Sequence, residues 1–130
     1  MKRVVIVAVV LSLALTVPAF ARTVLFQGAT SGAHVRPATL WLSVDGTLEA
    51  FHMHWRTWGG PIAIGNGKIE WHGCTPACGA APSHEANGSA HLSQIRVCSG
   101  QAYYSKVSVY VEDHGHLRLL RGITVNYAPC

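Results

Sequence analysis

Two His-x-His pairs are the residues in this chain whose type and spacing best fit metal chemistry. Residues two apart on a β-strand point to the same face of a sheet, so the imidazoles of His52 and His54 could hold one zinc or copper ion. His114 and His116 form the second pair, and the acidic residues at 112–113 beside it could add ligands. If the two segments lie close together in the fold, they predict a transition-metal site with three or four ligands.

A competing interpretation treats the same histidines as polar surface residues. His52 and His54 would then face solvent from the outer side of a strand, where Arg56 on the same face would repel a cation. Gly115 lies within an expected turn, so the two histidines that flank it need not point the same way. Binding of zinc or copper is therefore the alternative function, and the main interpretation requires no cofactor.

The four tryptophans allow a different chemistry, because an exposed aromatic ring can stack on a sugar or anchor a protein partner. Trp55 alternates with Phe51 and Met53, which is typical of a core position on a strand. Trp41 falls on the opposite face and Trp58 at the end of the same strand, so these two form a possible binding surface. Packing in the core is the competing explanation for both.

Catalysis and nucleic-acid binding have less support in the sequence. The chain contains no G-x-S-x-G elbow, no H-E-x-x-H motif and no phosphate-binding loop. Glu49 and Glu70 fall on different segments, and nothing marks them as an acid–base pair. We therefore predict no catalytic residue. The basic residues are scattered rather than clustered with aromatics, so no nucleic-acid partner is expected.

Residues 1–21 have the pattern of an export signal. Lys2 and Arg3 give a positive start, residues 4–17 are apolar apart from Ser12 and Thr16, and Ala19-Phe20-Ala21 is a small-x-small cleavage site. Cleavage after Ala21 would leave residues 22–130 as one secreted domain. The apolar stretch is shorter than the ~20 residues that span a bilayer, so no membrane association is expected after cleavage.

All four cysteines follow this signal, which predicts two disulfides in an oxidising compartment. Four cysteines allow three pairings, of which spacing favours Cys74–Cys78 in the loop C-T-P-A-C and Cys98–Cys130 at the chain end. Zinc binding by the thiolates is the competing explanation, and the export signal argues against it. The stapled loop over residues 74–83 suggests a further alternative, a secreted enzyme inhibitor that acts through this loop.

Period-2 alternation with turn residues between the runs predicts an all-β domain. The clearest unit is a hairpin over residues 38–55 that turns at Asp45-Gly46 and pairs Leu40 with Phe51. In that register Leu48 and Ala50 would point outward. The expected core face of this hairpin consists of Leu40, Leu42, Val44, Phe51, Met53 and Trp55.

Glycines mark two further turns. Gly65-Asn66-Gly67 is either a tight hairpin or part of one strand whose glycines let another backbone approach. Asp113-His114-Gly115 suits a three-residue hairpin loop, which would set Val111 opposite Leu117. With about seven short strands, the sequence predicts a small antiparallel β-sandwich or partly open barrel, stapled by disulfides.

Three segments in order resemble a family of small secreted proteins from actinobacteria. They are W-R-T-W-G over 55–59, I-A-I-G-N-G over 62–67 and C-T-P-A-C over 74–78, and the resemblance covers roughly residues 37–111. Members of that family often carry a cysteine about where Ser43 stands here, which leaves the partner of Cys98 open. The resemblance implies an exported, β-rich bacterial domain and supplies no activity. The main expectation is a binding or structural domain with an extracytoplasmic ligand or protein partner.

Overall fold

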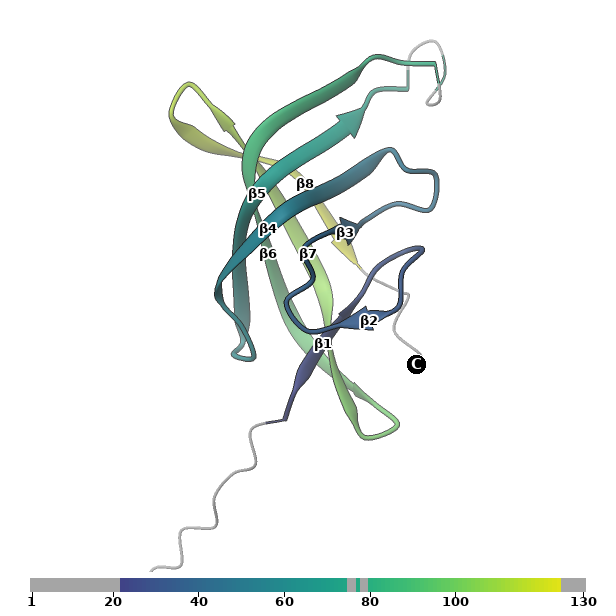
Figure 1. Ribbon diagram of the computed structural model, residues 1–130, viewed down its shortest axis with the longest axis vertical. Helices are drawn as coiled ribbons and strands as arrows, with labels where there is room; N and C mark the ends of the chain where they lie inside the picture. The colour runs from purple at the N-terminus through teal and green to yellow at the C-terminus, as the bar shows by residue number, and fades with distance from the viewer. Residues whose placement is uncertain (1–21, 75–76, 78–79, 125–130) are drawn as a thin grey trace, which may run out of the picture.

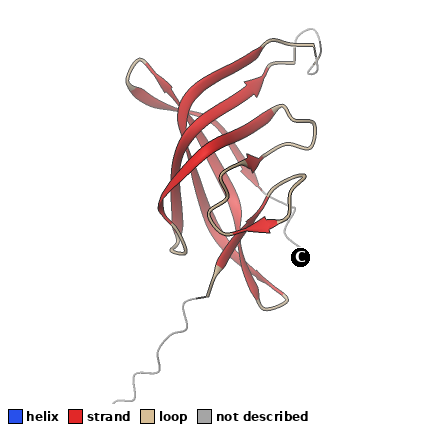
Figure 2. Cartoon of the chain, viewed as in Figure 1, coloured by secondary structure: helices blue, strands red, loops and turns tan. Residues whose placement is uncertain are grey.

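The computed structural model describes residues 22–74, 77 and 80–124. The expected export signal at 1–21 therefore lies outside the described residues. Within the described part the chain contains strands and loops and no helix, which confirms the all-β prediction (Figure 2). The strands are β1 (Val24–Gln27), β2 (Ala33–His34), β3 (Leu40–Trp41), β4 (Leu48–Thr57), β5 (Ile62–His72), β6 (Ser83–Cys98), β7 (Gln101–Asp113) and β8 (His116–Thr124).

These eight strands form one open mixed sheet in the order β2-β1-β7-β6-β5-β4-β3, and β8 pairs with β7. The sequence predicted about seven antiparallel strands arranged as a sandwich or partly open barrel. The antiparallel prediction is incomplete because β1 runs parallel to β7. Each of the long strands β4 to β7 pairs with the next one along the chain, so they build a continuous sheet rather than two separate ones.

The sheet is strongly bent, and the core lies inside the bend (Figure 1). The segment after β1 reaches β3 at the other end of the sheet, where the Ala29 N–H donates to the Trp41 carbonyl at 2.7 Å. The Met53 N–H similarly donates to the Ala38 carbonyl at 2.9 Å. The bend thus encloses apolar side chains contributed by most of the strands, of which the largest fully buried ones are Tyr104, Phe26, Leu40, Leu48, Ile69, Leu92, Val107, Val109 and Val111.

Glycines in β5 and β6 allow the sheet to bend, because neighbouring strands can approach them closely. Gly65-Asn66-Gly67 lies within β5, so of the two predicted alternatives the strand is correct. A Cβ on Gly67 would stand 2.6 Å from the Met53 sulfur and from the Phe51 carbonyl oxygen. A Cβ on Gly88 of β6 would overlap the Tyr110 carbonyl oxygen. Only glycine lets the neighbouring strands approach this closely.

The turn at Asp45-Gly46 is present, but its predicted register is wrong by one residue. Leu40 lies opposite Ala50 instead of Phe51. The reason is a longer loop, closed by a hydrogen bond from the Leu48 N–H to the Ser43 hydroxyl at 2.9 Å. Leu48 and Ala50 are consequently buried, contrary to the prediction, and Val44 is 69% exposed. A one-residue slip moves every side chain of a strand to the other face.

The hairpin at Gly115 also differs in detail from the prediction. Asp113 lies opposite His116, and Val111 lies opposite Arg118 instead of Leu117. His114 adopts a φ of 50° and Gly115 a φ of 80°, so the turn needs only these two residues. Two successive positive φ angles are the signature of the tight turn that best matches the twist of paired strands.

Candidate functional site

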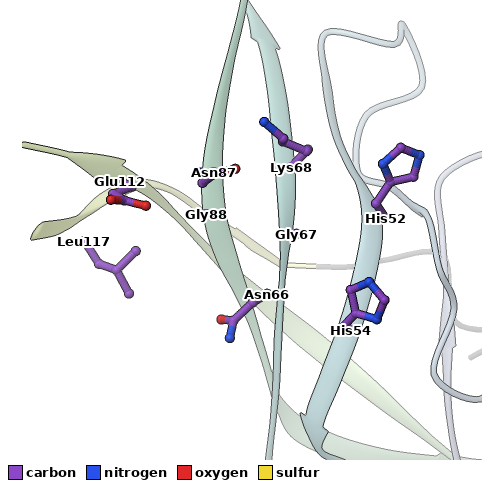
Figure 3. A pocket seen from close by; sticks show the side chains of 9 residues that line it. All are labelled: His52, His54, Asn66, Gly67, Lys68, Asn87, Gly88, Glu112 and Leu117. Carbon is purple, nitrogen blue, oxygen red and sulfur yellow. The ribbon is translucent and has the colours of Figure 1, made fainter. Parts of the chain in front are cut away.

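A shallow groove crosses the outer face of the sheet where the strands bend (Figure 3). Its volume is about 470 Å³. His52 and His54 lie along one side, Glu112 and Leu117 along the other, with the β5 and β6 side chains between them. We call this feature the sheet groove, and its lining residues are His52, His54, Asn66, Gly67, Lys68, Asn87, Gly88, Glu112 and Leu117.

Cross-strand pairing brings these polar side chains together. His54 lies opposite Asn66 of β5, and Lys68 lies opposite Asn87 of β6. Asn66 and Lys68 alternate along β5 with residues that face the core, such as Ile69, which is fully buried. Directly opposed residues in an antiparallel pair share one face of the sheet, so the polar side chains form adjoining rows on the outer face.

His52 joins this groove because the backbone of β4 is irregular at that point. The register of β4 against β5 shifts between Phe51 and His54, and His52 has a φ of 52°. The bulge lets Met53 and the half-buried Trp55 face the core while His52 and His54 are exposed. Bulges are common next to binding sites, where they redirect a side chain.

Most polar groups of the sheet groove are available to a ligand. Within the described residues, the side chains of His54, Asn66, Asn87 and Glu112 make no hydrogen bond or ion pair to other side chains or backbone. Lys68 is the exception, because its Nζ lies 3.5 Å from Glu85 Oε1. Asn66 and Asn87 both donate and accept hydrogen bonds, whereas the carboxylate of Glu112 accepts them.

The predicted four-histidine metal site does not form among the described residues. No group of three or more His, Cys, Asp or Glu side chains that could hold a metal ion occurs within 22–74, 77 and 80–124. His52 and His54 line the sheet groove, whereas neither His114 nor His116 does. The Nδ1 of His114 instead lies 2.6 Å from Asp113 Oδ1.

The two candidate tryptophans have different environments. Trp58 packs in an edge-to-face arrangement against Trp55 at 4.6 Å between ring centroids, and its indole N–H donates to the Val24 carbonyl at 2.9 Å. Trp58 is therefore partly buried and packs against the core. Trp41 is 39% exposed and lines a second hollow of about 330 Å³.

Sequence reasoning missed a row of three carboxylates across β4, β5 and β6. Glu49 lies opposite Glu70, and Glu70 lies opposite Glu85. Burial raises the pKa of Glu49, and the negative charge of Glu70 raises it further. The Ser83 hydroxyl donates to Glu70 Oε1 at 2.7 Å and lowers the pKa of that carboxyl. The sequence contained no signal for this row, because the register that aligns it depends on the turn and bulge geometry described above.

Each predicted disulfide joins one cysteine that the structure describes to one that it does not. Neither Cys74 nor Cys98 is a free thiol. Cys78 and Cys130 lie outside the described residues, so the two pairings stay a prediction. Residues 75–76 and 78–79 of the loop that a secreted inhibitor would use also lie outside the described residues, so the inhibitor alternative stays a prediction as well.

Among the described residues, no helix is long and apolar enough to cross a membrane. Comparison with protein families, with curated proteins and with solved structures found no match to this chain.

Proposed function

We propose that this chain is an extracytoplasmic binding domain and that the sheet groove is its ligand site. The single observation that carries the proposal is that hydrogen-bonding side chains from four strands, β4 to β7, line one groove and that most of them have no partner among the described residues. Ligand sites are typically concave and carry a small number of polar groups that orient the ligand. The compartment rests on the export pattern at 1–21 and on the four cysteines that follow it.

The composition of the groove favours a neutral ligand rich in hydroxyl or amide groups. Lys68 and Glu112 bring one charge of each sign to the lining of the groove. A strongly charged ligand would therefore meet as much repulsion as attraction. Asn66 and Asn87 each offer an amide donor and an acceptor, and His54 adds a ring nitrogen of either role.

A binding role accounts for these residues better than a catalytic one. Within the described part of the chain, neither His52 nor His54 makes a hydrogen bond to a carboxylate or a serine, as an activated nucleophile or base would require. The metal alternative is weaker too, because among the described residues no group of three or more His, Cys, Asp or Glu side chains could hold a metal ion.

Calorimetric titration of the purified secreted form tests the proposal. The ligands are chitotetraose, cellotetraose, an end-capped uncharged tetrapeptide of glycine and asparagine, inorganic phosphate and zinc chloride. We expect a neutral ligand to bind. The double substitution Asn66→Ala with Asn87→Ala should weaken that binding by about tenfold or more, since two hydrogen bonds contribute about 1 kcal/mol each.

Ser108→Ala is the matched control, because Ser108 lies on β7 outside the sheet groove. It should leave the affinity unchanged. Binding that the double substitution leaves intact would contradict the groove as the ligand site. Zinc binding that disappears in His52→Ala with His54→Ala would favour the metal alternative instead.

A further inference from the structure

Trp41 differs from two of the other tryptophans of the fold in having no partner for its indole N–H among the described residues. The indole of Trp55 donates to the Pro37 carbonyl at 2.9 Å, and that of Trp58 donates to the Val24 carbonyl at the same distance. Trp71 stacks on His84 at 5.4 Å between ring centroids. The ring of Trp41 makes no such contact with another ring of the described chain and is 39% exposed, although the preceding residue Leu40 is fully buried.

The backbone of Trp41 is held by the turn after β1, and we call its partly exposed ring a platform. The Trp41 carbonyl accepts a hydrogen bond from the Ala29 N–H at 2.7 Å. A Cβ on Gly28 would lie 3.0 Å from the same carbonyl oxygen and 2.5 Å from the Ser31 hydroxyl oxygen. The turn after β1 thus packs directly on the backbone of β3.

Small polar groups surround this platform in a hollow of about 330 Å³. The hydroxyls of Ser31 and Thr39 and the imidazole of His34 line it together with Trp41. Val35, Pro37 and Ala38 complete the lining, so no Lys, Arg, Asp or Glu side chain takes part. The hollow therefore combines one flat apolar surface with the hydrogen-bonding side chains of Ser31, His34 and Thr39.

We infer that the Trp41 hollow is a saccharide subsite that takes a neutral pyranose ring. A pyranose presents an apolar face of C–H groups and a rim of hydroxyls, which matches the indole face and its polar surroundings. The lack of charged lining residues disfavours anionic and cationic ligands. The Trp41 hollow has no residue in common with the sheet groove, so this inference does not depend on the proposed function of the groove.

Titration with chitotetraose, cellotetraose and maltotetraose tests the inference on the purified secreted form. Nitrogen-15 NMR follows the four indole N–H signals, and Trp41→Phe assigns the one that belongs to Trp41. We expect at least one of these sugars to shift the Trp41 signal in a saturable manner. Trp41→Ala should raise its dissociation constant by about tenfold or more, and Trp41→Phe should raise it less, because a smaller ring can still stack.

Val44→Ala is the matched control, since Val44 is an exposed apolar residue that lines neither hollow nor groove. It should leave sugar binding unchanged. The inference is overturned if none of the three sugars shifts the Trp41 signal, or if Trp41→Ala and wild type bind equally well. A response confined to the Asn66 and Asn87 side-chain amides would support the sheet groove and overturn the Trp41 subsite. If Trp41→Ala does not fold, Trp41→Phe takes its place. Weaker sugar binding by Trp41→Phe than by wild type supports the subsite, and equal binding overturns it.

Discussion

At the scale of single residues, the sheet groove depends on an unusual backbone conformation at His52. A φ of 52° within a strand is uncommon for any residue other than glycine, and histidine is among the side chains that tolerate it best. Such conformations cost of order 1–3 kcal/mol and are found preferentially at functional sites. A strained backbone at His52 and a position in the sheet groove are both expected of a residue in a binding site.

Substitutions at His52 test this strain. His52→Gly should preserve or raise the free energy of unfolding, because glycine adopts positive φ without cost. His52→Val should lower it by about 1 kcal/mol or more, since a β-branched residue is strongly disfavoured there. Chemical denaturation measures both. His54→Gly, in the same strand but without a positive φ, should lower stability by about 0.5–1 kcal/mol. Equal losses for His52→Gly and His54→Gly would contradict the account.

Glu49 gives a prediction about pH. Burial and the charge of Glu70 raise the pKa of Glu49 in the folded protein above its ordinary value, so folding favours the protonated carboxyl. The stability contributed by this group is present below about pH 4 and is lost as the pH rises through the folded pKa. Glu49→Gln should therefore raise the thermal midpoint at about pH 7 and leave it nearly unchanged at about pH 3.5.

The control for this experiment is Glu85→Gln. Glu85 pairs with Lys68 at 3.5 Å on the surface, so its neutralisation should give no gain at neutral pH. A gain of equal size at both pH values would show that Glu49 acts through packing and not through its charge.

At the scale of elements, the groove exists because the long strands bend where glycines occur. Gly88→Ala should cost about 2 kcal/mol or more or prevent folding, because the new methyl would overlap the Tyr110 carbonyl and stand 2.5 Å from Ile69 Cγ1. Gly122→Ala in β8 is the matched control, since nothing lies within 4 Å of a Cβ there. Denaturant unfolding compares the two. A Gly88→Ala protein as stable as Gly122→Ala would argue against the bend.

The turn between β4 and β5 is tied to β7 by one hydroxyl. Tyr104 is fully buried, its O–H donates to the Gly60 carbonyl at 2.8 Å, and it accepts from the Gly59 N–H at 2.9 Å. Tyr104→Phe should lower the free energy of unfolding by about 1–3 kcal/mol, because two hydrogen bonds of about 0.5–1.5 kcal/mol each are lost. Tyr103→Phe is the control, since the Tyr103 hydroxyl makes no hydrogen bond within the described residues. Equal losses of stability in Tyr104→Phe and Tyr103→Phe would contradict this role of the Tyr104 hydroxyl.

Local sequence patterns predicted the elements well and their registers poorly. Alternation and turn residues located the strands around Asp45-Gly46 and Gly115, because these signals act within a few residues. The Leu40–Ala50 pairing escaped prediction, since it depends on a hydrogen bond to the Ser43 side chain that no residue pattern encodes. The bulge at His52 then altered which side chains face outward. The groove therefore contains the predicted His52 and His54 but also unpredicted neighbours from β5 to β8.

At the scale of the whole molecule, the two faces of the bent sheet differ in composition. Its inner face buries the apolar side chains, and its outer face carries the sheet groove. The pairing of β1 with β7 is parallel and joins segments distant in sequence, so no local turn signal could predict it. The open arrangement leaves the outer face accessible across several strands.

The secreted form should begin at Arg22 and contain no free thiol. Two disulfides would make its mass about 4 Da lower than that of the reduced chain. We expect peptide mapping to find Cys74–Cys78 and Cys98–Cys130, which mass spectrometry of the unreduced protein can establish. A different pairing would revise how the end of the chain is held, and an uncleaved N-terminus would contradict the proposed export.

The most direct test of the central claim is a map of ligand contacts on the sheet groove by nitrogen-15 NMR. The secreted form is titrated with the neutral ligands named above, and the side-chain amides of Asn66 and Asn87 are followed together with the backbone amides of Gly67 and Gly88. At least one neutral ligand should shift these four signals in a saturable manner, and Ser108→Ala should leave the response unchanged. If every ligand leaves all four signals unmoved, the sheet groove is not the binding site.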